Sequence, residues 1–427
     1  MKKYLLKETY RIIIIGLVVG VVIALYKYCA HLVISCAKYL YLSNDITMRL
    51  IFLIISIIIM FIGYRIVKYD GNIQTSGLPQ IDLHIKHNTR QIKWYKSLPL
   101  MFVSSLISFF NGLPVGSEAP SLFLSAMVSM GLTSKEKNEM CKQENDEDVY
   151  ISMGAGFAAA FFTPLASVCY IFEEFLEKVK IKNIIKLIAV SLIATIVSYF
   201  INNEKIITIE LTTIVELKDY LLIIPFIIFM FIIAFVMKRA LIITKKFINN
   251  HYQNIIIRNR YFIIMILSII IINTIPILGG SGIDLIKNTN MNTFWYIILI
   301  YLVVRIILCA LANNCMASGG SLLPLFAIGA LAGMLFVKIC GLENDKASLY
   351  ILYGMTILFA FVNKAPLTGL ALTISFVGLS NCLDLLIYSL IITTFVYLIV
   401  KVLKIESIND KRTKLLRTSR KYNNVGR

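Results

Sequence analysis

Charged residues are scarce in this chain of 427 residues: they make up 15% of it, whereas hydrophobic residues make up 58%. A soluble domain carries about 25% charged residues, and the mean hydropathy of +0.79 excludes such a domain here. Apolar runs such as 12–24, 221–237 and 385–400 approach the roughly 20 residues that a helix needs to cross a bilayer. We therefore expect an all-α polytopic membrane protein in contact with the lipid bilayer.

The sequence also lacks the motifs of several enzyme and metal-binding classes. It contains no Ser/His pair, no His-Glu-x-x-His and no Walker A loop, so we expect no enzyme. The eight cysteines have no metal-type spacing, and His84 and His87 have only Asp82 as a nearby third ligand. We expect no metal ion and no cofactor.

Acidic residues are few, 24 against 42 basic ones, which gives a net charge of +18. The basic residues lie in the tails and between apolar runs rather than on one polar face, which argues against a nucleic-acid partner. Because the N-terminus and the tail 401–427 are both basic, the positive-inside rule places both in the cytoplasm. The first apolar run has no small-x-small cleavage site after it and is expected to remain as a membrane helix. The acidic cluster from Glu144 to Asp148 is expected in a solvated connecting loop.

Proline motifs recur in the two halves of the chain. Pro120 and Pro164 of the first half correspond to Pro324 and Pro366 of the second, at nearly the same offset of about half the chain. This recurrence predicts a single transmembrane domain over 1–427, with inverted-topology halves at about 10–205 and 215–405 and a basic tail at about 406–427. Chance similarity of short motifs is the alternative. The short apolar runs 120–130 and 322–336 are expected to be helices that stop partway through the membrane.

Three glycine-rich turns precede short helices, at 75–79, 116–120 and 319–324. In each turn, glycine allows tight geometry and the proline suits the first helical turn. Helix N-termini that meet in the membrane present free amide groups and partial positive charge, which bind an anion. Ser76 adds a hydroxyl donor, and Glu118 is a lone carboxylate whose cost in an apolar region indicates a function. Ordinary helix starts at interhelical contacts are the alternative.

Several segments together carry a resemblance to a known family. They are Ser76-Gly-Leu-Pro79, Gly116-x-Glu-x-Pro120, the run from Gly154 to Ala166 that continues to Glu173-Glu174, Gly319-Gly-Ser-Leu-Leu-Pro324 and Ala365-Pro-Leu-Thr-Gly369. In order and spacing they resemble the signature segments of the CLC family of chloride channels and chloride/proton antiporters, over about residues 10–405. Each motif alone is weak, and the set is specific.

The resemblance implies a homodimer in which each protomer has one pore, with inverted halves whose broken helices meet at a central anion site. It implies that Glu118 is the gate and proton acceptor and that Glu174 transfers protons at the inner side. A helix end at the cytoplasmic interface is the interpretation of Glu173 and the alternative for Glu174. The only bound group that it implies is chloride. The chloride-binding positions that it implies are Ser76, Gly77, Ser321 and Leu322.

The chain departs from the family pattern at several positions. Ser117 and Ala119 replace the basic residue and the second glycine that usually flank the gating glutamate. Met101 stands where many relatives carry a buried lysine, and no tyrosine lies near 406–407, where the pore tyrosine of the family is expected. Retention of Ser76 favours chloride over fluoride.

Two transport functions follow from these patterns. The leading hypothesis is a chloride/proton antiporter in the plasma membrane, with chloride and protons as substrates. The alternative is a passive anion channel of the same fold, because the altered residues beside the gate would leave a path open. An intramembrane enzyme is the third class, and the missing motifs argue against it.

Overall fold

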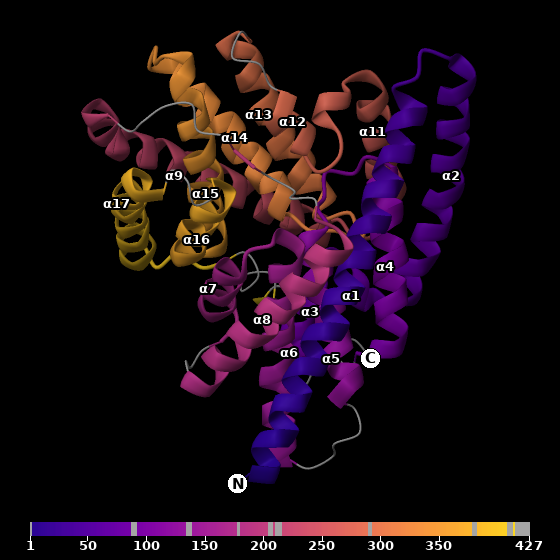
Figure 1. The fold of residues 1–427 in the computed structure, drawn as a ribbon. Coiled ribbons are helices and arrows are strands. Elements are labelled where there is room, and N and C mark those ends of the chain that lie inside the picture. The colour runs from indigo at the N-terminus through magenta and orange to yellow at the C-terminus, as the bar shows by residue number, and fades with distance from the viewer. Residues whose placement is uncertain are drawn as a thin grey trace.

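The structure is a computed structural model that describes residues 2–86, 92–133, 139–176, 180–203, 208–209, 216–288, 293–377, 382–407 and 413–414. Within these ranges it contains 17 α-helices, three short 3₁₀ helices and two isolated backbone bridges in place of strands. The all-α prediction is therefore confirmed (Figure 1). His87 and most of the basic tail lie outside the described residues.

The first half of the chain forms eight helices and one 3₁₀ turn. They are α1 (Lys2–Tyr41), α2 (Ile46–Tyr69), η1 (Gly71–Ile73), α3 (Leu78–Ile85), α4 (Trp94–Phe110), α5 (Glu118–Thr133), α6 (Glu139–Phe161), α7 (Pro164–Glu174) and α8 (Ile181–Ile201). The short helices α3, α5 and α7 begin at the predicted glycine-rich and proline-containing turns. The first apolar run continues as one helix to Tyr41.

The second half repeats this order. It comprises α9 (Leu217–Asn250), α10 (Ile255–Arg258), α11 (Arg260–Thr274), η2 (Pro276–Leu278), α12 (Ile283–Asn288), α13 (Trp295–Ala312), α14 (Leu322–Ile339), η3 (Asn344–Lys346), α15 (Ala347–Asn363), α16 (Pro366–Val377) and α17 (Cys382–Val402). The run from α3 to α8 matches the run from α12 to α17, helix by helix. The predicted architecture of two repeated halves is confirmed. The residue boundaries of the halves and of the tail remain predictions.

Eight helices of the described chain are long and apolar enough to cross a membrane: α1, α2, α8, α9, α13, α14, α15 and α17. In the apolar windows of α14 and α15, 89% and 83% of the residues are buried, whereas in α2 only 28% are. The remaining windows leave most of their apolar side chains on the outside, where lipid replaces water as the solvent. The protein is therefore a multi-pass membrane protein with α14 and α15 at its centre.

Small residues allow α14 and α15 to approach closely. A Cβ atom at Gly333 would collide with the carbonyl oxygen of Tyr350, and one at Gly354 would collide with the carbonyl oxygen of Gly329. The same relation holds in the first half, where a Cβ atom at Gly156 of α6 would collide with a serine hydroxyl of α5. Without a hydrophobic force between helices in lipid, such close backbone packing supplies much of the association energy.

The acidic cluster is not in a connecting loop, so that prediction is wrong. It lies in the N-terminal part of α6, where Glu147 accepts hydrogen bonds from Lys180 and from Asn183 (3.0 Å). Asp148 forms ion pairs with Arg11 of α1 (2.9 Å) and with Lys186 of α8 (3.4 Å). The basic residues that stabilise this helical segment are remote in the sequence, so the charge run alone did not reveal them.

A valine at position 333 should destabilise the fold. Gly333→Val places three carbon atoms against the backbone of α15, and overpacking of this kind costs about 1–3 kcal/mol. We expect a lower midpoint temperature of unfolding in detergent. Gly341→Asn is the control, because a Cβ atom at Gly341 meets no atom within 4 Å and asparagine tolerates its φ of +63°. Equal midpoints for both variants would contradict the packing argument.

Candidate functional site

The turns before α3, α5 and α14 form one hydrogen-bonded unit. The amide of Thr75 donates to the carbonyl of Ala317 (3.1 Å), and the amide of Gly319 donates to the carbonyl of Thr75 (2.9 Å). Gly116 and Gly320 exchange amide-to-carbonyl hydrogen bonds of 2.7 and 2.9 Å. The three helix N-termini therefore start from a common point, as predicted, although their turns lie up to about 245 residues apart in the sequence.

Glycine is required at two points of this unit. Gly77 precedes α3 with a φ of +71°, and a Cβ atom there would collide with the ring of Phe123 in α5. Gly319 has a φ of +152°, and a Cβ atom there would lie 2.5 Å from the side chain of Val115. Both positions combine a backbone conformation that favours glycine with a neighbour in close contact. The glycines thus bring the helix ends together.

Glu118 is the first residue of α5 and its side chain is fully buried. One carboxylate oxygen accepts a hydrogen bond from the Ser117 hydroxyl (2.9 Å), and the other has no hydrogen-bond partner among the described residues. This second oxygen lies against Gly116, where a Cβ atom would collide with it. A buried carboxylate with an unsatisfied oxygen is costly. The position therefore favours a carboxylate that can leave this space and be replaced by another group.

The predicted anion-binding positions lie on the same unit. Ser76 is buried and its hydroxyl oxygen accepts a weak hydrogen bond from the amide of Leu78 (3.4 Å). Ser321 precedes α14 and Leu322 is its first residue, so both are at an N-terminus whose first amides have no partner within the helix. Gly77 is the residue before α3. The structure therefore brings these four positions and Glu118 together at converging helix ends.

The structure shows how two residues that depart from the family pattern, Ala119 and Met101, are packed. The methyl group of Ala119 packs against Gly320, which has no side chain. A Cβ atom at position 320 would lie 2.6 Å from this methyl group. Met101 is fully buried in α4. Packing in this region therefore accommodates the alanine, and an apolar side chain fills the position where many relatives carry a lysine.

Glu173 and Glu174 lie apart from this unit, at the end of α7. The Glu173 carboxylate accepts hydrogen bonds from the amides of Leu367 and Thr368 (both 2.8 Å) and from the Thr368 hydroxyl (2.7 Å). These donors form the first turn of α16, where a negative charge compensates the free amides. Glu173 is therefore a helix cap supplied by another helix, and not the simple helix end that its sequence position predicts.

Glu174 has a different partner. Its carboxylate accepts a hydrogen bond from the hydroxyl of Ser407 (2.8 Å), which follows α17. Ser407 lies where the family's pore tyrosine is expected, so a hydroxyl group is present there on a shorter side chain. No local pattern predicts this contact, because the two residues are 233 positions apart in the sequence.

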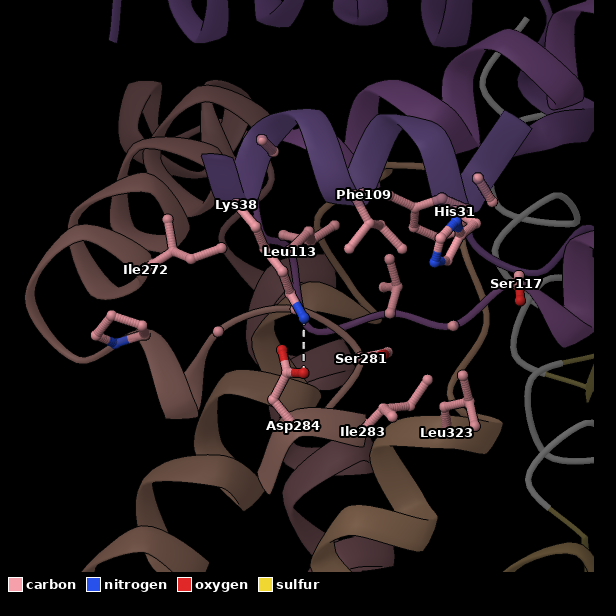
Figure 2. A pocket seen from close by; sticks show the side chains of 18 of the residues that line it. His31, Lys38, Phe109, Leu113, Ser117, Ile272, Ser281, Ile283, Asp284 and Leu323 are labelled. Carbon is pink, nitrogen blue, oxygen red and sulfur yellow. Dashed lines mark hydrogen bonds and ion pairs between the residues drawn. The ribbon is translucent and has the colours of Figure 1, made fainter. Parts of the chain in front are cut away.

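A cavity of about 260 Å³ lies next to the converging turns (Figure 2). Residues from α1, from the turn before α5 and from the turn before α12 line it, among them Lys27, Lys38, Ser117 and Asp284. Lys27 is 7% exposed, although in the sequence it only interrupts an apolar run. A lysine inside a membrane helix was the available signal.

Metal-binding geometry is absent from the part of the chain that the structure describes. No three His, Cys, Asp or Glu side chains lie close enough there to hold an ion. The first-turn amides and the hydroxyl groups of the site are donors of the kind that bind an anion.

Comparisons with known proteins agree with this geometry. A profile of the family described as voltage gated chloride channel matches residues 58–399. The H(+)/Cl(-) exchange transporter ClcA of Vibrio campbellii is 28% identical over 385 residues, which cover 84% of this chain and 80% of that protein. The protein of the same name from Vibrio cholerae is 27% identical, with 85% and 80% covered.

Solved structures show the same fold. A slow cyanobacterial Cl⁻/H⁺ antiporter has a TM-score of 0.81 at 20% identity, with 97% of this chain and 98% of that chain covered. A CLC-type fluoride/proton antiporter has a TM-score of 0.75 at 18% identity, with 91% and 94% covered. The predicted architecture of inverted halves with broken helices is confirmed by these likenesses.

Removal of the Glu173 cap should lower the stability of the protein. Glu173→Ala removes three hydrogen bonds to the first turn of α16, and loss of a helix cap costs about 0.5–2 kcal/mol. We expect a lower midpoint of thermal unfolding in detergent. Glu173→Gln should have an intermediate midpoint, because the amide oxygen still accepts hydrogen bonds but carries no charge. A wild-type midpoint for Glu173→Ala would show that the cap does not stabilise the fold.

Proposed function

Because the chain belongs to the family of voltage-gated chloride channels, we propose that it moves chloride across the membrane in exchange for protons. The observation that supports this most directly is the buried Glu118 carboxylate at the point where three helix N-termini converge. The curated relatives are named as exchange transporters for the same two ions. They are transporters, which agrees with the expectation that this chain is not an enzyme.

Competition between a carboxylate and chloride couples the two ions. Each helix N-terminus carries about half a positive charge, so the site between them favours one negative group. When Glu118 is ionised, its carboxylate fills the outer part of this site. When Glu118 takes up a proton, its attraction to the helix ends falls and chloride replaces it. Each turn of this exchange moves chloride one way and a proton the other.

The chloride ion is proposed to contact the Ser76 hydroxyl and the amides near Gly77, Ser321 and Leu322. The Ser76 hydroxyl hydrogen is available to it, because the oxygen of that hydroxyl is the acceptor in the bond with Leu78. Hydrogen bonds to a charged ligand are worth about 1.5–3 kcal/mol each. No other bound ion or cofactor is required by this proposal.

Glu174 is proposed to pass protons between the inner solution and Glu118. Free hydronium does not cross an apolar interior, so a titratable group is needed on the path. The half-buried Glu174 is such a titratable group, and its carboxylate accepts a hydrogen bond from the Ser407 hydroxyl. Glu173 is excluded from this role, because its two oxygens are both used as acceptors at α16.

A passive chloride channel is the second candidate. Its support is the residue beside the gate: Ser117 holds Glu118 through one neutral hydroxyl, which binds a carboxylate less strongly than a charged donor. A gate held this weakly would leave the anion path open for longer. Chloride movement without protons would then be the activity.

We place the protein in the plasma membrane as a homodimer with both termini in the cytoplasm. The basic N-terminus supports this orientation. Exposed isoleucine and leucine side chains on α8 and α17 supply apolar surface for lipid and for a second copy of the chain.

Replacement of Glu118 by glutamine should uncouple the two fluxes. Glu118→Gln keeps the size of the side chain but removes its charge and its ability to take up a proton. We expect chloride flux in proteoliposomes that no longer depends on pH and moves no protons. Coupled exchange at the wild-type rate in this variant would eliminate Glu118 as the gate.

Replacement of Glu174 separates the antiporter from the channel. Glu174→Gln still accepts the Ser407 hydrogen bond but cannot exchange a proton, so proton flux should vanish while chloride flux continues. Glu173→Gln is the matched control on the neighbouring residue and should retain proton flux. If Glu174→Gln moves protons as the wild type does, the proposed relay is wrong.

A further inference from the structure

The cavity beside the converging turns has a basic wall. Lys27, His31 and Lys38 recur at helical spacing along the face of α1 that lines it. Across the cavity, Asp284 of α12 forms an ion pair with Lys38 at 2.6 Å, and Figure 2 shows these two side chains facing each other. The positive charge of Lys38 is therefore compensated. Lys27 lines the same wall and is more buried than Lys38.

Lys27 is expensive to keep in this position. Its side chain is 93% buried in a membrane-spanning helix, and its ammonium group lies 4.2 Å from the ring centroid of Phe162. Such a cation–π contact offsets part of the desolvation cost of an ammonium group. Ionisable residues at membrane depth mark ion pathways as a rule. The burial of Lys27 therefore needs an explanation beyond packing.

The position of Lys27 is fixed relative to the gate. The neighbouring Tyr26 donates a hydrogen bond from its hydroxyl to Ser105 of α4 (2.8 Å), which sets the rotation of α1. Lys27 then lines the same cavity as Gly116 and Ser117, the two residues before Glu118. The cavity therefore places Lys27 on the same side of the gate as the turn that carries Glu118. A cation in this position attracts an anion in the cavity and the carboxylate of the gate alike.

We propose that Lys27 supplies, from the first membrane helix, the positive charge that draws chloride through the cavity to the gate. This inference rests on the proposed movement of chloride past Glu118. The proposal also explains why the neutral Ser117 can replace the basic residue that usually flanks the gate, because Lys27 provides the positive charge from α1. Lys27 acts on chloride by its field and is a positioning residue for the ion.

The test measures the chloride concentration that gives half-maximal flux into proteoliposomes. Lys27→Met should raise this concentration about three- to tenfold, with little change in maximal flux. This is the loss of affinity expected when one unit charge is removed at a moderate distance from chloride in a medium of intermediate dielectric constant. Lys27→Arg should stay close to the wild type. Adding Ser117→Lys to Lys27→Met should lower the concentration again, because it returns a cation to the same cavity.

The matched control removes a neutral pair from the same wall. Lys38→Met combined with Asp284→Asn leaves the net charge unchanged and should leave half-saturation near that of the wild type. If Lys27→Met does not fold, Lys27→Gln provides the neutral variant for the same comparison. Wild-type half-saturation in a folded neutral variant, or an equal loss in Lys27→Arg, would overturn the proposal. Half-saturation by chloride is measurable with or without proton movement, so failure of proton coupling would contradict the proposed function alone.

Discussion

The backbone hydrogen bonds among the turns at 75–77, 116–118 and 317–320 are the constraint on which the rest of the structure depends. They join segments from both halves of the chain and point three helix N-termini at one place in the apolar interior. Backbone groups in such a place must find partners inside the protein. The turns satisfy one another through backbone hydrogen bonds, and the first-turn amides of the helices are the groups that we propose bind the anion.

The glycines and the lone carboxylate follow from this constraint. Gly77 and Gly319 adopt conformations that favour glycine where neighbouring side chains leave no room for a Cβ atom. The buried Glu118 is tolerated because the partial positive charge of the helix N-termini favours a negative group there. In the proposed function the same surroundings bind chloride, so one site serves both a carboxylate and a mobile ion. Lys27, on a helix that contributes no turn to the unit, adds a full charge from the side.

Much of the fold and of the anion site was predictable from local patterns. The glycine-rich turns, the prolines and the recurrence between halves each depend on short segments, and Glu118 was conspicuous as a charge in an apolar region. Partners that are remote in sequence were not predictable. The hydrogen bonds of Glu173 to α16, that of Glu174 to Ser407 and the ion pairs of Asp148 all join residues that only the folded chain brings together. Lys27 was recognisable as a charge inside a membrane helix, but its role could not be predicted without the residues that line the cavity.

The proposed function requires that chloride and protons move in opposite directions and that the two movements are coupled at Glu118. The most direct measurement loads wild-type proteoliposomes with chloride, sets the same pH on both sides, and follows the external pH while chloride leaves down its gradient. We expect protons to enter the vesicles, so that the external solution becomes alkaline, and we expect this to continue against a moderate opposing pH gradient. Chloride efflux with no change in external pH, under conditions where membrane voltage is clamped, would contradict it.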